Sequence, residues 1–148
     1  MNDDLTLLGS ASAGPQRTLE TFPNRHPGRR YTVVLECDEF TCVCPMTGQP
    51  DFATIRIQYV PNQRILESKS LKLYLWSYRN EGSFHEHVVN QILDDVVAAL
   101  DPLTCRIVGR FNVRGGIAIT VEAQHEAVGD PASRSDMNDQ YSNRRSAA

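Results

Sequence analysis

The sequence predicts an α+β fold in which two helices pack on one face of an antiparallel sheet, with the element order ββααββ. Three observations predict it. Apolar and polar residues alternate over residues 52–60 and again over residues 105–121, which is the period of half-buried strands. Between these stretches, apolar residues recur at helical spacing, and turn signals separate the segments. A chain of 148 residues suits one domain of ordinary size.

The first predicted strand runs from Phe52 to Val60 and has one apolar and one polar side. The apolar side carries Ile55, Ile57 and Tyr59, and the polar side carries Thr54, Arg56 and Gln58. The turn residues Pro61 and Asn62 follow. We expect Ile65 and Leu66 to return as a short antiparallel strand, since a hairpin loop of about two to five residues fits this spacing.

Two helices are predicted next, because the apolar period changes after residue 68. The first begins at Ser68 and is interrupted at residues 80–82, and its apolar positions are Leu71, Tyr74, Leu75 and Tyr78. The second runs from about Phe84 to Leu100 and stops at Asp101-Pro102. Its apolar stripe lies opposite Asp94 and Asp95 and consists of Val88, Val89, Ile92, Leu93, Val96, Val97 and Leu100.

The last two predicted strands form a second hairpin. One strand alternates through Cys105, Ile107, Gly109 and Phe111, and the other returns through Ile117, Ile119 and Val121. The turn between them is Arg114-Gly115-Gly116. With both helices on one face of the sheet, the other face is predicted to meet a partner or water.

The two ends of the chain are predicted to lie outside the folded domain, which then covers residues 31–125. Residues 1–30 mix small, polar and turn-forming residues without a sustained period, so an N-terminal arm is expected there. Residues 126–148 are predicted to be a polar tail, frayed from Asp130 onward, because large aliphatic residues are scarce.

Composition narrows the class of partner. The net charge of −3 and the isoelectric point near 5.8 argue against a general nucleic-acid binder, which usually carries a basic excess. No stretch reaches the roughly 18 apolar residues of a membrane span, and the N-terminus shows no signal-peptide pattern. We therefore expect a cytoplasmic protein with a small-molecule partner.

Cys44 and Asp51 bound a loop that contains two prolines and a glycine, directly before the first strong strand. A cysteine reacts as the thiolate, so a catalytic Cys44 needs a positive neighbour, a helix N-terminus or a base. Asp51 is a candidate for moving its proton. The spacing of the two residues fits a structural interpretation equally well. In that interpretation Cys44 is a small buried apolar residue, and Asp51 is a turn residue or a helix cap. The residues alone leave both interpretations open.

The other cysteines suggest a rival interpretation, a tetrahedral zinc site of Cys37, Cys42 and Cys44, with or without Cys105. Such sites usually contain two paired Cys-x2-4-Cys units, and the sequence does not contain two of them. In the absence of a secretion signal, disulfides are a weaker expectation than free thiols. We therefore predict no metal site.

Lys69 and Lys72 are the only lysines of the chain and stand three residues apart at the start of the first predicted helix. They share one helix face, where ammonium groups and the unpaired N–H groups of the first turn are able to hold phosphates. A solvated helix face without a ligand is the alternative.

The segment Ser83–Glu86 fits a capping box, with Ser83 as N-cap and Glu86 reaching back from the third helical position. Capping of the second predicted helix is sufficient to explain this segment. A functional interpretation is also open, in which Glu86 accepts hydrogen bonds from the N–H edge of a guanine-like ring and His85 is a donor or proton relay.

Together these segments resemble the nitrile reductases of queuosine biosynthesis, the 7-cyano-7-deazaguanine (preQ0) reductases, in their short single-domain form. The resemblance covers about Leu35 to Glu122. It is carried by residues 44–54, Glu67–Tyr74, Phe84–Glu86 and Arg114–Ile117. It implies a tunnelling fold (T-fold), in which sheets of several subunits join into a barrel and active sites form between neighbouring chains.

The resemblance also implies a role for individual residues. Cys44 would be the nucleophile and Asp51 the general acid. Substrate binding would fall to Leu66, Glu67, Ser68, His85 and Glu86. NADPH phosphates would be held by Lys69, Lys72 and Arg114. The implied partners are a deazapurine and further copies of the chain, with no direct nucleic acid and no membrane.

The implied chemistry agrees with these residue types. A nitrile carbon is a poor hydride acceptor, so addition of a thiolate, with a proton from Asp51 on nitrogen, creates a reducible thioimide. Two hydrides from NADPH then give the amine. The rival hypotheses are a zinc-dependent hydrolase of the same fold group and a non-catalytic oligomeric scaffold.

Overall fold

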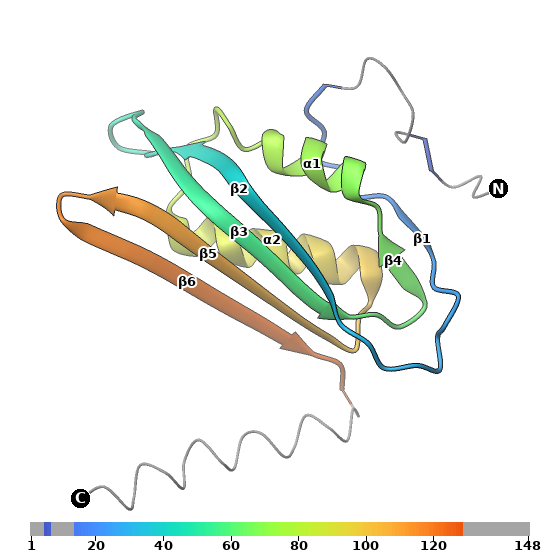
Figure 1. Ribbon diagram of the computed structural model, residues 1–148. Coiled ribbons are helices and arrows are strands. Elements are labelled where there is room, and N and C mark those ends of the chain that lie inside the picture. Colours follow the sequence, from blue (N-terminus) through green and yellow to red (C-terminus); the bar gives the residue numbers. More distant parts are fainter. Residues whose placement is uncertain (1–4, 7–13, 129–148) are drawn as a thin grey trace, which may run out of the picture.

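The computed structural model describes residues 5–6 and 14–128 of the chain. Figure 1 shows four long strands side by side, with α2 along one face and α1 beside the edge strand β2. The elements are β1 (Thr21–Pro23), β2 (Val33–Val43), β3 (Pro50–Val60), β4 (Arg64–Leu66), α1 (Ser68–Trp76), α2 (His85–Leu100), β5 (Thr104–Arg114) and β6 (Ile117–Glu126). The four long strands and the two helices follow one another as ββααββ, so the predicted α+β class is confirmed.

The four-stranded sheet has the order β2-β3-β5-β6, and all neighbouring strands are antiparallel. Its helix-facing side carries the alternating apolar residues, which are aligned across strands: Leu35 pairs with Ile57, and Ile57 pairs with Ile107. Ile55, Ile57 and Tyr59 are at most 1% exposed. The predicted strand over residues 52–60 and the predicted hairpin over residues 105–121 are confirmed.

The first hairpin differs from the prediction. The partner of β3 in that hairpin is β2, which the sequence analysis did not identify, and β4 pairs with β1 in a separate two-stranded sheet. The cause is that β3 is an interior strand with both edges occupied, by β2 and β5. β4 has no free edge of β3 to pair with, and its Leu66 amide instead donates to the Tyr59 hydroxyl at 3.0 Å.

Both predicted helices are present on one side of the sheet. The residues of α2 that are buried against the sheet are Val88, Val89, Ile92, Leu93, Val96 and Leu100. The helix ends at Asp101, whose left-handed backbone (φ 45°) closes the last turn. Gly109 of β5 permits the close approach of α2, because a Cβ there would lie 2.6 Å from a methyl carbon of Val89.

The predicted capping box at residues 83–86 is wrong. The N-cap of α2 is Phe84, no side chain caps the helix, and the Ser83 hydroxyl donates to the Phe84 carbonyl. Ser83 is not the N-cap because its backbone belongs to an extended connection: its amide donates to the Val43 carbonyl at 3.1 Å. In contrast, Glu67 caps α1 with its side chain.

Part of the segment predicted to be an N-terminal arm lies on the domain, since β1 pairs with β4 and Leu19 packs against the core. The predicted frayed tail from Asp130 lies outside the described residues. Among residues 5–6 and 14–128, no helix combines the length and the apolar character needed to cross a membrane.

Candidate active site

Cys44 occupies a tight turn between β2 and β3. The Cys44 amide donates to the Gln49 carbonyl at 2.8 Å, and the Gly48 amide donates to the Cys44 carbonyl at 2.9 Å. Gly48 has φ 72°, a left-handed conformation that favours glycine. The sequence Pro-Met-Thr-Gly between Cys44 and Gln49 therefore folds back on itself and leaves the Cys44 side chain half-buried at the end of the sheet.

Hydrogen bonds to sulfur lower the pKa of Cys44 below its ordinary value of 9.0. The largest cause is the Thr47 hydroxyl, followed by the amides of Thr47 and Met46, while partial burial opposes them and the Arg114 guanidinium adds a smaller lowering effect. Burial has the opposite effect on two other thiols, because it raises the pKa of Cys42 to about 11 and that of Cys105 to about 12. Cys44 is thus the thiol that its surroundings favour as a nucleophile.

Asp51 is the charged centre of this end of the sheet. It lies opposite Cys42 in the β2–β3 register and is only 4% exposed. One carboxylate oxygen is ion-paired with Arg114 from the end of β5, and the other lies 3.2 Å from His85 Nε2 at the start of α2. Arg114 also donates to the Gln49 side chain. Residues of β3, β5 and α2 therefore meet at one buried carboxylate, and Gln49 of the Cys44 turn contacts the same arginine.

The imidazole of His85 is held in a fixed plane. It stacks on the Phe111 ring, with 3.8 Å between the ring centroids and 10° between the planes. Glu86 is the next residue of the first turn of α2, and its side chain is exposed. Sequence reasoning placed His85 and Glu86 together with Cys44, and the structure brings the first turn of α2 to the Cys44 turn.

Leu66, Glu67 and Ser68 lie at the junction of β4 and α1. The Glu67 carboxylate is buried and accepts hydrogen bonds from the amides of Lys69 and Ser70, each at 2.7 Å. Ser68 is exposed at the first position of α1. The Glu67 side chain thus fixes the helix start, and Ser68 is the member of this trio that faces outward.

The Cys44 turn and the β4–α1 junction lie at opposite ends of the sheet (Figure 1). The Leu66 amide donates a hydrogen bond to the Tyr59 hydroxyl, and Tyr59 lies eight residues along β3 from Asp51. Eight residues of strand span roughly 26 Å. Within one chain, the structure therefore does not bring Leu66, Glu67 and Ser68 to Cys44.

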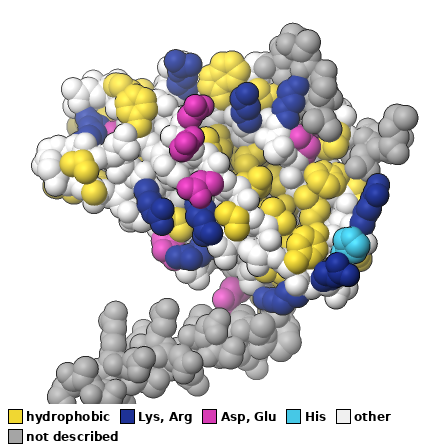
Figure 2. All heavy atoms as spheres, in the orientation of Figure 1, with side chains coloured by type: hydrophobic (Ala, Val, Ile, Leu, Met, Phe, Trp, Pro, Cys, Tyr) yellow, Lys and Arg dark blue, Asp and Glu magenta, His cyan; other side chains and the backbone are white. Residues whose placement is uncertain are grey.

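A groove of about 1120 Å³ runs along the edge strand β2, between this strand and α1. Its lining reaches from Leu35 and Ser68 at one end to Val43 and Pro50 beside the Cys44 turn at the other. Lys72, Trp76 and Arg79 of the α1 side also line it. Figure 2 shows apolar and charged side chains interspersed on the face of the molecule in this view.

The predicted phosphate-binding residues are not assembled in one place. Lys72 is exposed and lines the groove, and Lys69 is half-buried one turn earlier. Arg114 lies instead at the Cys44 turn, where it is paired with Asp51. The chain thus carries positive charge along α1 and, separately, at the Cys44 turn.

Comparison with known proteins identifies the family. The sequence model of the family described as QueF-like protein matches residues 50–130. The NADPH-dependent 7-cyano-7-deazaguanine reductase of Syntrophus aciditrophicus is 68% identical over 125 residues, which cover 84% of this chain and 89% of that protein. The chain belongs to the QueF-like family.

Two further QueF-like relatives agree in sequence and in fold. The protein with the same name from Thiobacillus denitrificans is 57% identical over 124 residues, covering 83% of this chain and 89% of that one. The crystal structure of the archaeosine synthase QueF-Like in the apo form superimposes with a TM-score of 0.61 at 25% identity, over 66% of this chain and 95% of that chain. The predicted family resemblance and fold are confirmed.

Sequence reasoning missed three residues of the candidate site: Thr47, which contacts Cys44; Gln49, which contacts Arg114; and Phe111, which orients His85. Thr47 and Gln49 are visible in the sequence as polar residues of the Cys44 loop, so their proximity was a usable signal. Phe111 gave no such signal, because its alternation with Gly109 and Ile107 is the same as that of an ordinary core residue.

The zinc interpretation does not fit the positions of the cysteines. Cys37 pairs with Ile55, Cys42 with Asp51 and Cys105 with Tyr59, so the thiols are distributed along the sheet instead of converging. Within the described part of the chain, no group of three or more His, Cys, Asp or Glu side chains is arranged to hold a metal ion.

Proposed function

We propose that this chain catalyses the NADPH-dependent reduction of the nitrile of 7-cyano-7-deazaguanine to 7-aminomethyl-7-deazaguanine, in queuosine tRNA-modification biosynthesis. The observation that carries the proposal is the juxtaposition of Cys44, whose pKa is lowered, with the buried carboxyl of Asp51. Membership of the QueF-like family and relatives with that printed name over most of the chain support the substrate.

The first step makes the nitrile reducible. The Cys44 thiolate attacks the nitrile carbon, a C–S bond forms, and one π bond of the C≡N group opens toward nitrogen. Asp51 takes the Cys44 proton as the thiolate forms and passes it to the nitrile nitrogen, which gives a neutral thioimide on Cys44. Thr47 and Arg114 favour the thiolate before the attack, because both lower the pKa of Cys44.

The remaining steps need two hydrides and one more proton. NADPH supplies the hydrides, one to the thioimide carbon and a second after the C–S bond has broken and the thiolate has left. The sum is R–C≡N, two NADPH and two protons, giving R–CH2–NH2 and two NADP+. Asp51 must therefore be reprotonated within one turnover. His85, 3.2 Å from Asp51 and partly open to solvent, is placed to pass it that proton.

The groove beside β2 suits a dinucleotide. Apolar walls, including the exposed rings of Phe52 and Trp76, fit flat ring systems, while Lys72 and Arg79 offer positive charge to phosphates. Lys69 lies one turn from Lys72 on the same helix. Arg114 is placed to reach a phosphate near Cys44 if it exchanges its contact with Asp51, and we propose Lys69, Lys72 and Arg114 as the cofactor contacts.

We propose further that a working site combines two copies of the chain. His85 and Glu86 would anchor the deazaguanine beside Cys44, while Leu66, Glu67 and Ser68 of a neighbouring copy would complete the pocket. The separation of roughly 26 Å along β3 supports this arrangement, because one copy alone cannot supply both groups. A free thiol that must stay reduced is consistent with work in the cytoplasm.

The test is the covalent adduct. Wild-type protein mixed with 7-cyano-7-deazaguanine in the absence of NADPH is expected to gain the mass of one nitrile per chain, detectable by intact-mass spectrometry. Cys44→Ala is expected to lose both the adduct and NADPH oxidation, whereas Cys37→Ala, as the matched control, keeps both. Wild-type protein that forms no adduct and oxidises no NADPH with this nitrile would refute the proposal.

A further inference from the structure

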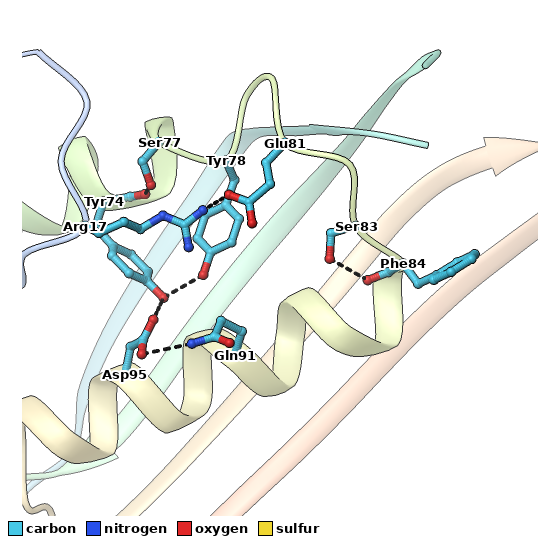
Figure 3. Close-up of polar contacts among 9 residues, drawn as sticks. All are labelled: Arg17, Tyr74, Ser77, Tyr78, Glu81, Ser83, Phe84, Gln91 and Asp95. Carbon is cyan, nitrogen blue, oxygen red and sulfur yellow. Dashed lines mark hydrogen bonds and ion pairs between the residues drawn. The ribbon is translucent and has the colours of Figure 1, made fainter. Parts of the chain in front are cut away.

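Tyr78, just after α1, is held rigidly by a chain of hydrogen bonds that reaches α2 (Figure 3). Its side chain is 1% exposed, and its hydroxyl lies 2.8 Å from that of Tyr74. The Tyr74 hydroxyl donates to Asp95 at 2.5 Å, and Asp95 also accepts from Gln91 at 3.0 Å. Because Tyr74 has one proton and gives it to Asp95, Tyr78 is the donor to Tyr74.

Arg17, from the segment before β1, lies on this fixed ring. Its guanidinium carbon is 3.6 Å from the centroid of the Tyr78 ring, which is a close cation–π contact. The same guanidinium is ion-paired with Glu81 (Figure 3). The backbone beside it is also attached to α1, since the Gln16 amide donates to the Leu73 carbonyl at 3.2 Å.

Glu81 is the point at which this contact reaches the Cys44 turn. The Glu81 carbonyl accepts from the Val43 amide at 3.1 Å, and the Ser83 amide donates to the Val43 carbonyl at 3.1 Å. Between them, Gly82 lies so close to Pro45 that a Cβ there would be 3.3 Å from its Cα. The connection at residues 79–84 is therefore packed directly against the residues on both sides of Cys44.

The start of α2 depends on this connection. Its N-cap, Phe84, forms no capping hydrogen bond through its side chain, so the first turn lacks the local cap that fixes many helix starts. The extended connection, hydrogen-bonded to both the amide and the carbonyl of Val43, therefore contributes to fixing where the chain enters the helix. His85 and Glu86 are the first two residues after that entry.

We propose that Arg17 is a positioning residue for His85 and Glu86, the pair proposed to bind the deazaguanine ring. Arg17 contacts the Tyr78 ring and forms an ion pair with Glu81, and these two contacts hold residues 79–84 against the Cys44 turn. The position of this connection in turn sets the distance between the Cys44 thiol and the first turn of α2. The inference rests on the proposed function in one respect, that His85 and Glu86 bind the deazaguanine.

The kinetic test separates the two substrates. Arg17→Ala is expected to raise KM for 7-cyano-7-deazaguanine about five- to tenfold and to leave KM for NADPH within about twofold, as loss of a partly exposed cation–π contact and ion pair predicts. Arg17→Lys is expected to fall between, because lysine keeps the charge and loses the planar fork. Arg106→Ala is the matched control, since Arg106 forms a comparably exposed ion pair with Glu122 on the opposite face of the sheet.

A second readout needs no substrate. In Arg17→Ala, the 15N chemical shift of His85 Nε2 is expected to move toward that of an imidazole without its Asp51 contact, and the amides of Val43 and Ser83 are expected to exchange about tenfold faster. Arg106→Ala is expected to change neither. Should the wild type reduce no nitrile, the proposed function falls and the His85 resonance still decides the positioning role.

Two results would overturn the inference. One is an unchanged His85 resonance in Arg17→Ala. The other is faster exchange at Val43 and Ser83 with KM for the nitrile unchanged, because Arg17 would then be a structural contact without influence on the site.

Discussion

The two ends of β3 hold carboxylates in different ways. At the Pro50 end, Asp51 contacts two side chains, Arg114 and His85, which come from different elements. At the Val60 end, Glu67 is bonded to two backbone amides of α1. Side-chain partners are able to leave and return during a reaction, whereas a backbone cap is lost only if the helix start unfolds. The difference indicates that the first end suits proton transfer and the second suits a rigid seat for a ligand.

The largest expected effect is at the Cys44 end. Asp51→Asn is expected to lower kcat by about 10² to 10⁴ because the amide has no proton to donate as an acid. Alkylation of Cys44 by iodoacetamide is expected to continue, since Thr47 and Arg114 still favour the thiolate. Single-turnover NADPH oxidation and alkylation kinetics measure the two effects. Asp94→Asn, on the exposed side of α2, is the control, and a loss of less than tenfold in Asp51→Asn would contradict a general-acid role.

Gly109 lies between the two ends and sets how closely α2 approaches the sheet. In Gly109→Ala the new methyl group would lie 2.6 Å from Val89 and 3.1 Å from Phe111, so side chains must shift. We expect the free energy of unfolding to fall by about 1–3 kcal/mol in urea titrations. Gly28→Ala is the matched control, since nothing lies within 4 Å of its Cβ. Equal stability of the two variants would show that Gly109 does not limit the approach of α2.

At the other end, Glu67→Ala removes the side-chain cap of α1. We expect a loss of about 1 kcal/mol in the free energy of unfolding, because the amides of Lys69 and Ser70 lose their acceptor. Urea titration measures it, with Glu39→Ala on the exposed bulge of β2 as control. If stability is unchanged while KM for the nitrile rises, Glu67 contacts the substrate and does not act chiefly as a cap.

The smallest expected effect concerns the pH dependence of Cys44. Thr47→Val removes the hydrogen bond that contributes most to the lowered pKa of Cys44, so that pKa rises. The thiolate is lost as pH falls through the pKa, and the alkylation profile is therefore expected to move to higher pH, with a several-fold slower reaction at neutral pH. Thr120→Val on β6 is the control. A profile that stays in place would assign the lowered pKa to Arg114 and the backbone amides.

The strands that could be predicted from the sequence are those in which apolar and polar residues alternate without interruption. The alternation in β3, β5 and the start of β6 is uninterrupted, and those strands were predicted. In β2 a bulge between Cys37 and Phe40 shifts the period and exposes both Asp38 and Glu39, so the strand was missed. The strand β4 was predicted, but its pairing with β1 was not, because β1 has only three residues and lies far from β4 in the chain.

The sequence indicated which residues form the candidate site, but it did not indicate the contacts between their side chains. The resemblance indicated Cys44, Asp51, His85 and Arg114, and these residues lie together. The pairing of Arg114 with Asp51 joins residues 63 positions apart and depends on the β5–β6 turn, which no local pattern encodes. The support of the Cys44 turn by residues 79–84 and Arg17 was likewise invisible, because it runs through backbone atoms and a ring face.

Subunit complementation is the most direct test of the claim that the two ends of the sheet meet in one site across two copies. Cys44→Ala inactivates one end, and Ser68→Trp fills the exposed position at the other end and is expected to fold normally. Each variant alone is expected to be inactive. Co-refolded in equal amounts, they should recover up to about a quarter of wild-type NADPH oxidation, because a random neighbour pair is intact at both contributions about one time in four. A mixture no more active than its components would contradict the shared site.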